Sequence, residues 1–319
     1  MLAIYQKGTA AVVKPLTRGN SQRNTVSSSS MARTPGVPHR QLGRVLRAMR
    51  LESGLSILMA AKAISRGSGT LQRLETGNAN KISDSDIDNL CRLYRQPERA
   101  SELKALAAQR MEPSWWDEYT DQVAPSFGVY LGLESAAESV TIYRPDIVSG
   151  LFQTREYAEA LDRVYFVDDL PEERERRLRV RRERQNLILR TVSPLHVDLV
   201  IDQGVLRRVV HGPRVMARQC RHLADLPPNV SVRVLPDTAG YPVGTTAGPF
   251  TILDFGTSSD GKALEPPVVY IESYAGSIHL ERPDSVRRYR NAFQKIQRVA
   301  LGRTESKRLL RQVAKEYAP

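Results

Sequence analysis

The chain lacks several features that would assign it to a class at once. It has only two cysteines, Cys91 and Cys220, far apart in sequence, so a framework of several disulfides is excluded. One disulfide between them is an alternative, but we favour two reduced and buried thiols. No apolar run approaches the ~20 residues of a membrane-spanning helix, and the N-terminus lacks the apolar core and cleavage site of a secretory signal. We therefore expect a cytoplasmic protein without membrane contact.

Motifs of catalysis and metal binding are also missing. No Gly-x-Ser-x-Gly elbow, phosphate-binding loop or His-x-x-x-His spacing occurs. Four histidines are scattered over the C-terminal part: His196, His211, His222 and His279. His196 and Asp198 share one face of a predicted strand, and Glu134, Asp254 and Glu272 could converge in space, but structural acids are the stronger interpretation. We expect a protein that has no enzymatic activity and binds no metal ion or cofactor.

Acidic residues are absent from the first forty positions, which carry only basic charge. Residues 41–77 carry six bases against Glu52 and Glu75, so the formal net charge of +12 leaves about +2 for the remainder. Positive charge concentrated in this way attracts polyanions such as nucleic acid. The bases of the first segment are Lys7, Lys14, Arg18, Arg23, Arg33 and Arg40.

The first 38 residues have no sustained hydrophobic periodicity, and we expect them to form a disordered basic arm. Met31 stands directly before the first strong helical pattern, so translation from Met31 is an alternative to translation from Met1.

Five helices are predicted between residues 39 and 111. Leu42, Leu46 and Met49 recur at helical spacing, and Gly54 ends that first helix. Ser56 can cap the second helix. The third opens at a Gly-Ser-Gly sequence and closes at Gly77, the fourth begins near residue 83, and the fifth runs from about 98 to 110.

The remainder, residues 112–319, mixes helical and strand patterns and predicts an α+β domain of undetermined strand order. Trp115 and Trp116 mark the change of domain, where we expect packing rather than a ligand platform. Helices are predicted near 129–139, 154–165, 171–190, 213–225, 284–301 and 304–316. Strands are predicted at 195–201, 231–235, 250–255 and 268–271.

The second and third helices have the form of a helix-turn-helix, with small or apolar residues where they cross. Residues 41–95 resemble the Cro-like (xenobiotic-response-element, XRE) repressor domain. The matching residues are Leu42, Arg50, Gly54-Leu55-Ser56, Ala61 and Leu71-Gln72-Arg73-Leu74-Glu75-Thr76-Gly77. The resemblance implies a structural ion pair between Arg50 and Glu75 that locks the first helix against the third.

The same resemblance places base reading on five residues: Ser68, Gly69, Thr70, Gln72 and Arg73. Arg73 can offer a fork to guanine, and Gln72 could serve adenine or a phosphate. Ile57 occupies the place where the family usually has a phosphate-gripping glutamine. Affinity for the DNA backbone is therefore assigned to Lys62, Arg66, Lys81 and the basic arm, and Ser56 is counted among the DNA-binding residues. We expect modest direct readout by a homodimer that binds two half-sites of double-stranded DNA.

Residues 115–317 look like the C-terminal domain of the actinobacterial Scr-type antitoxin-like transcriptional regulators. The matching runs are Trp115-Trp116, Tyr130-Leu131-Gly132-Leu133-Glu134, Val148-Ser149-Gly150-Leu151-Phe152-Gln153-Thr154-Arg155-Glu156-Tyr157-Ala158, Val230-Ser231-Val232-Arg233-Val234-Leu235-Pro236, Phe250-Thr251-Ile252-Leu253 and Val269-Tyr270-Ile271-Glu272. The resemblance implies a regulator whose neighbouring gene encodes a small acidic partner protein that it binds.

The helix predicted at 171–190 is rich in both signs of charge, and a solvated face laced with ion pairs is the plainer interpretation. Its surplus of positive charge suggests an alternative, in which Arg177, Arg181 and Arg184 dock the acidic partner. The leading hypothesis is a transcriptional regulator with a partner- or ligand-binding C-terminal domain. An antitoxin-like interaction module with weak DNA binding and an enzyme fused to a DNA-binding domain are the alternatives.

Overall fold

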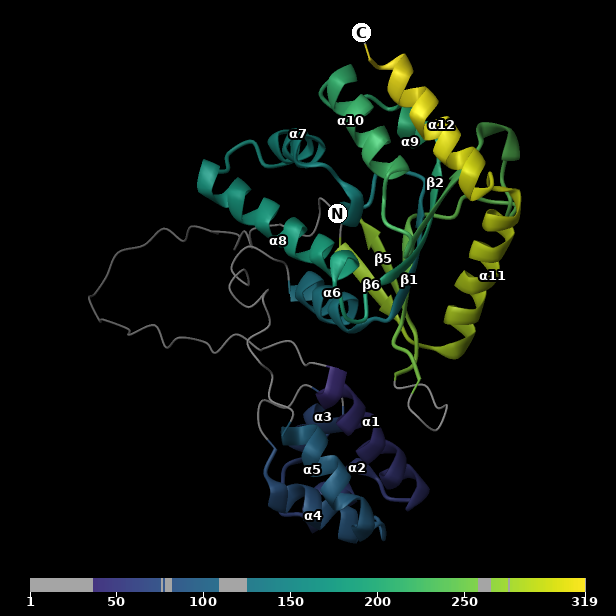
Figure 1. Cartoon of the computed structure of the whole chain (residues 1–319). Coiled ribbons are helices and arrows are strands. Elements are labelled where there is room, and N and C mark those ends of the chain that lie inside the picture. The colour runs from purple at the N-terminus through teal and green to yellow at the C-terminus, as the bar shows by residue number, and fades with distance from the viewer. Residues whose placement is uncertain are drawn as a thin grey trace, which may run out of the picture. The chain divides into compact units, whose positions relative to one another are not determined.

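The computed structural model describes residues 37–75, 77, 82–108, 125–257, 265–274 and 276–318. These residues fall into two compact units, one before and one after the stretch 109–124 in sequence. The first is helical, and the larger second unit combines helices with a sheet (Figure 1). The predicted fold class is thus confirmed. The predicted basic arm, apart from its last two residues, and the Trp115-Trp116 pair lie outside the described residues.

The described part of the helical unit contains the five helices predicted for it. They are α1 (Val37–Glu52), α2 (Ile57–Ala63), α3 (Ser68–Glu75), α4 (Asp84–Leu93) and α5 (Ala100–Ala108), with a 3-10 turn, η2 (Pro97–Arg99), before the last. Ser56 caps α2 as predicted, accepting a hydrogen bond from the Met59 backbone N–H at 3.2 Å, and Gly54 follows α1 in the left-handed conformation, φ +67°. These local signals delimit the helices because each satisfies backbone groups that the helix end leaves without partners.

One apolar cluster holds this unit together. Every helix contributes to it, including Leu46 of α1, Ala60 of α2, Leu71 of α3, Ile87 of α4 and Leu103 of α5. The apolar positions that recur every three or four residues are the ones that lie inside, as the hydrophobic effect requires of amphipathic helices.

The second unit is built on a six-stranded mixed sheet with the strand order β3-β2-β1-β4-β5-β6. Strands β1, β2 and β3 run parallel to one another, whereas β4, β5 and β6 continue the sheet in antiparallel pairs from β1. The strands are β1 (Ser139–Arg144), β2 (His196–Asp202), β3 (Val230–Leu235), β4 (Phe250–Asp254), β5 (Val268–Ser273) and β6 (Gly276–Leu280).

Helices cover both faces of this sheet (Figure 1). The main core packs one face against α6, α7, α8, α10 and α12, and the opposite face packs against α11 through a smaller core that includes Val286, Phe293 and Ile296. The helices are α6 (Pro125–Ala136), α7 (Arg155–Tyr165), α8 (Pro171–Leu189), α9 (Gln203–Arg207), α10 (Pro213–Ala224), α11 (Pro283–Val299) and α12 (Arg303–Glu316), with three-residue 3-10 turns at η4 (Gly150–Phe152) and η5 (Asp237–Ala239).

Two strands were missing from the sequence prediction. The first is β1, which pairs with both β2 and β4 in the middle of the sheet. The predicted helix 129–139 ends instead at Ala136, and β1 begins three residues later. The second is the edge strand β6, whose residues pair with β5.

Both cysteines are free and buried. Burial raises the pKa of the Cys220 thiol to about 11, so this group stays protonated near neutral pH. This state matches the reduced thiols that we favoured over a disulfide. In the described parts of the chain, none of the helices combines the length and the apolar character that crossing a membrane demands.

The prediction that Arg177, Arg181 and Arg184 form a docking surface is wrong. All three residues are buried, at 2–3 % exposure. Their spacing of four and three residues places them on the inward face of α8, beside buried Val180 and Leu187. The sequence signal was misleading because the acids that neutralise these arginines lie outside α8, at separations of 8, 19 and 50 residues.

Each buried arginine of α8 has a carboxylate partner. Arg181 binds both oxygens of Asp162 from its two Nη atoms at 2.7 Å, and Arg177 pairs with Asp169 while its guanidinium lies 3.9 Å from the centroid of the Phe166 ring.

The third arginine, Arg184, completes a polar cluster around Glu134. Arg184 donates to the Glu134 carboxylate at 2.6 and 2.9 Å, and the hydroxyl of Tyr130 donates to the same carboxylate at 2.6 Å. Buried charges of this kind are tolerated only when paired and hydrogen-bonded.

We predict that Arg181→Met destabilises the protein by about 2–4 kcal/mol, because the buried Asp162 carboxylate would lose both hydrogen bonds from Arg181 and keep only the longer contact with Arg177, at 3.7 Å. Urea unfolding followed by circular dichroism measures the change. The exposed Arg182 on the same helix offers a matched control, and Arg182→Met should shift the free energy of unfolding by less than about 0.5 kcal/mol. Equal effects of the two substitutions would contradict the assignment of Arg181 to the core.

Candidate nucleic-acid interface

Helices α2 and α3 form a compact helix-turn-helix. Ala60 and Ala61 on α2 are buried, as are Leu71 and Leu74 on α3. Small residues on α2 let the two helices approach closely. The turn between them includes Ser65 in the left-handed conformation, φ 56°. One face of α3 is thus fixed against the core and the other is free to face a ligand.

The ion pair implied by the family resemblance is present between α1 and α3. The Nε and Nη2 atoms of Arg50 donate to the two carboxylate oxygens of Glu75 at 2.6 and 2.9 Å. The third nitrogen of the guanidinium, Nη1, donates to the backbone oxygen of Leu55 at 2.7 Å, in the loop between α1 and α2. Both charged side chains are buried, so one guanidinium joins three elements of the domain through charge-assisted hydrogen bonds.

A close backbone contact fixes α3 further. A Cβ atom at Gly43 of α1 would lie 2.4 Å from the backbone oxygen of Leu74 and 2.8 Å from that of Glu75. Only glycine lets α1 sit this close to the end of α3. Sequence reasoning missed this role, because nothing in the local pattern distinguishes Gly43 from any other glycine within a helix.

The residues predicted to read bases all lie on the exposed side of α3: Ser68, Gly69, Thr70, Gln72 and Arg73. Arg73 lies close to the hydroxyl of Thr70, with a donor–acceptor distance of 3.4 Å. A Cβ placed on Gly69 would meet nothing within 4 Å, so this part of the face is open. The structure therefore brings the predicted reading residues together on one surface.

The predicted phosphate-binding residues are placed less uniformly. Lys62 is exposed on α2, and Ser56 is exposed at its N-terminus, where its hydroxyl is engaged in the cap. Ile57 is partly buried and packs against the domain core, so it supports the scaffold. Lys81 lies outside the described residues.

Arg66 has a structural partner that the sequence did not suggest. Its Nε and Nη2 atoms donate to the two carboxylate oxygens of Asp86 at 3.0 Å each, which ties the turn to the start of α4. Partial burial acts to raise the pKa of Asp86, but hydrogen bonds from Arg66 and Ser83 outweigh it and the pKa is lowered. Asp86 thus stays ionised at neutral pH, and Arg66 would have to leave it to bind a phosphate.

The three acids considered as a catalytic group each pair with a different arginine. Glu134 pairs with Arg184, Glu272 lies 3.6 Å from an Nη atom of Arg144, and Asp254 pairs with Arg290. These contacts give each carboxylate a structural role. Within the ranges that the structure describes, no cluster of three or more His, Cys, Asp or Glu side chains is arranged to hold a metal ion.

Comparison with known families agrees with this geometry. Residues 41–103 match the family model of a helix-turn-helix domain, which spans α2 and α3. Residues 127–312, more than half of the chain, match the model of a domain of unknown function, DUF5753. The chain belongs to the DUF5753 family. Within this family member, the helix-turn-helix match supports a DNA-binding regulator. Searches of curated proteins and of solved structures found no match.

We predict that Arg50→Met destabilises the protein by about 3–5 kcal/mol, because the Glu75 carboxylate would remain buried without its partner. The double variant Arg50→Met/Glu75→Gln should recover part of this loss, since it removes the stranded charge. Urea unfolding of the full chain measures both, with the exposed Arg47→Met as a control on the same helix. A double variant as unstable as the sum of the single variants would show that the two residues are not coupled.

We also predict opposite outcomes for alanine at two glycines of this domain. Gly43→Ala should lower the free energy of unfolding by about 1–3 kcal/mol, because the methyl group would clash with the backbone of α3. Gly69→Ala should leave stability unchanged or raise it by up to about 1 kcal/mol, since alanine favours the helix and the site is open. Thermal unfolding of the two variants provides the comparison, and a harmless Gly43→Ala would disprove the close contact.

Proposed function

We propose that this protein is a sequence-specific, DNA-binding transcriptional regulator of the cytoplasm, and that it acts as a homodimer without enzymatic activity. The observation that carries this proposal is the exposed face of α3, where Gln72 and Arg73 stand on a scaffold fixed by the Arg50–Glu75 pair. A guanidinium on such a face can donate two hydrogen bonds to guanine in the major groove.

The dimer follows from the size of the reading surface. One helix-turn-helix contacts only a half-site, and two-fold symmetric proteins match palindromic operators whose half-sites lie about one helical turn apart. The concentration of positive charge in the first 77 residues supports binding to the DNA backbone. We assign a share of that affinity to the basic arm and to Lys62 and Lys81.

The C-terminal domain is proposed to regulate the DNA-binding domain by binding a small acidic protein encoded nearby. Support comes from the resemblance of residues 115–317 to antitoxin-like regulators. The partner has to bind a surface other than Arg177, Arg181 and Arg184, because these are buried in ion pairs.

A second candidate function is an antitoxin-like interaction module with weak sequence preference. Two features of the helix-turn-helix favour it. Ser68 and Gly69 offer little or no side chain at the reading edge, and Ile57 packs against the core where a phosphate contact is usual in the Cro-like family. Partner binding without any operator preference would support this second function over the first.

Substitutions at Arg73 and Lys62 should separate base reading from phosphate contact. Arg73→Ala is expected to reduce discrimination between the preferred operator and unrelated DNA by ~1–3 kcal/mol, because the contact to guanine is lost. Lys62→Ala should weaken binding to all sequences alike and lower the slope of log K against log salt concentration by about one unit. Fluorescence anisotropy with operator and scrambled duplexes at several salt concentrations measures both effects.

The two variants serve as controls for each other, since each removes one positive charge from the same domain. If discrimination is unchanged in Arg73→Ala, the reading role of α3 is disproved. If the protein binds neither duplex, or if its affinity for both does not depend on salt concentration, the proposal of DNA binding fails as a whole.

A further inference from the structure

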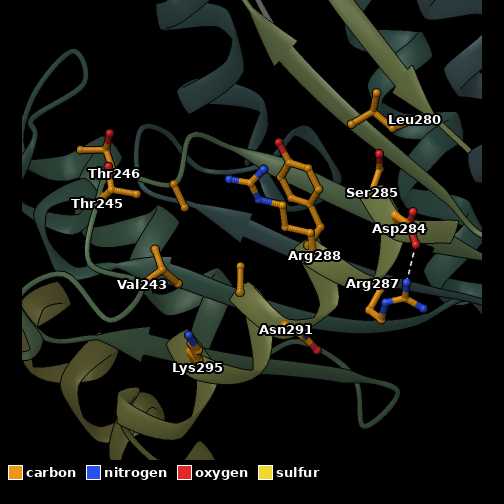
Figure 2. A pocket seen from close by; sticks show the side chains of 13 residues that line it. Val243, Thr245, Thr246, Leu280, Asp284, Ser285, Arg287, Arg288, Asn291 and Lys295 are labelled. Carbon is orange, nitrogen blue, oxygen red and sulfur yellow. Dashed lines mark hydrogen bonds and ion pairs between the residues drawn. The ribbon is translucent and has the colours of Figure 1, made fainter. Parts of the chain in front are cut away.

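A large open groove lies on the C-terminal domain, beside the smaller core against which α11 packs. It has a volume of about 730 Å³ and is bounded by α11, by the end of β6 and by the loop that joins β3 to β4 (Figure 2). A cavity of this size accommodates a small organic molecule. The loop contributes Val243, Thr245 and Thr246, and β6 contributes Leu280.

Helix α11 presents two different faces. Val286, Phe293 and Ile296 pack into the core on one side of the sheet. Arg288 and Lys295, together with Asn291 between them, line the groove on another face. Arg288 and Lys295 are seven residues apart, which places them two helical turns apart on the same side of the helix, about 10 Å along its axis.

The groove carries a surplus of positive charge. Arg287 pairs with Asp284 at one end (Figure 2). Arg288 and Lys295 are both exposed, and no carboxylate among the described residues lies within ion-pair distance of either. Elsewhere in this domain, many arginines have an acidic partner. Two cations that face a cavity without an internal counter-charge are poised to bind an anion from solution.

The other groups around the groove suit an organic anion. Thr245, Thr246 and Ser285 carry hydroxyl groups that can donate to anionic oxygens, and Asn291 carries an amide. Val243 and Leu280 add apolar surface for a carbon skeleton. Figure 2 shows Arg288 and Lys295 coming from α11 and the two threonines from the facing loop, so polar groups line both sides of the groove.

We propose that this groove is a binding site for a small organic anion that carries phosphate or carboxylate groups. The guanidinium of Arg288 and the ammonium of Lys295 bind the anionic groups, and the hydroxyl groups of the facing loop complete their hydrogen bonding. The ligand extends along α11 for up to about 10 Å, the axial distance between the two helical positions that carry the cations. This site goes beyond the proposed DNA-binding function and does not depend on it, because the ligand binds the C-terminal domain alone.

The test measures the affinity of small molecules for the full-length protein, without DNA, by isothermal titration calorimetry. ADP represents a phosphate-bearing ligand, suberate represents a dicarboxylate with its charges far apart, and adenosine is the neutral reference. At least one of the two anions should bind, and adenosine should bind more weakly than that anion. Arg288→Gln and Lys295→Gln should each weaken the binding of that anion by roughly tenfold or more, since charge-assisted hydrogen bonds are lost.

Arg298→Gln is the matched control, because it removes the same charge from an exposed position on α11 outside the groove. It should leave anion affinity within about twofold of the unchanged protein, since exposed charges at a distance are screened. The helical content of all three variants, measured by circular dichroism, should match that of the unchanged protein.

Several outcomes would overturn the site. One is that neither ADP nor suberate binds. Another is that Arg298→Gln weakens binding as much as Arg288→Gln and Lys295→Gln, which would mean that the anions respond only to the net charge of the protein. A third is that the two groove variants reduce affinity for duplex DNA but not for either small anion, which would assign the groove to nucleic acid. None of these results bears on base reading by Arg73, so the two proposals stand or fall separately.

Discussion

Each buried arginine in the described part of the chain pairs with a carboxylate, and this requirement organises both units. A guanidinium without a counter-charge is costly in a protein interior, so its position dictates which elements come together. In the helical unit, Arg50 joins α1 to Glu75 of α3 and to the loop before α2. In the larger unit, Arg181 and Arg184 hold α8 to α7 and α6 in the same way. Such pairs fix how the helices are oriented relative to one another, which the non-directional packing of an apolar core does only weakly.

The helix-turn-helix could be predicted because its signals are local. Caps such as Ser56, the apolar spacing of Leu42, Leu46 and Met49, and the glycine after α1 all act within a few residues. The residues on the exposed face of α3 were predicted from the resemblance to the Cro-like domain. Two contacts could not be predicted from local signals, namely the close approach of Gly43 to α3 and the Arg66–Asp86 pair. Both depend on residues that only the folded chain brings together.

The C-terminal domain was harder to predict for physical reasons. Its central strand β1 follows α6 after a short connection, so the helical pattern was extended through the boundary. The arginines of α8 looked like a solvated face because sequence spacing shows which residues share a face but not which face lies inside. Asp162 and Glu134, which neutralise Arg181 and Arg184, are separated from them by 19 and 50 residues. The groove beside α11 likewise requires the β3–β4 loop to face the helix, and the sequence gives no sign of this.

The open space at Gly69 has a consequence for how this protein can change. The Arg50–Glu75 pair and the close contact at Gly43 hold α3 against the core through its buried side. The exposed side of the helix takes no part in these contacts. A Cβ at position 69 would meet no neighbouring atom within 4 Å. An alanine side chain can therefore be introduced there without repacking any other part of the domain. Position 69 can thus accept added atoms while the fold beneath stays as it is. Under the proposed function, such additions change the contacts that α3 makes with DNA without changing the domain that carries it.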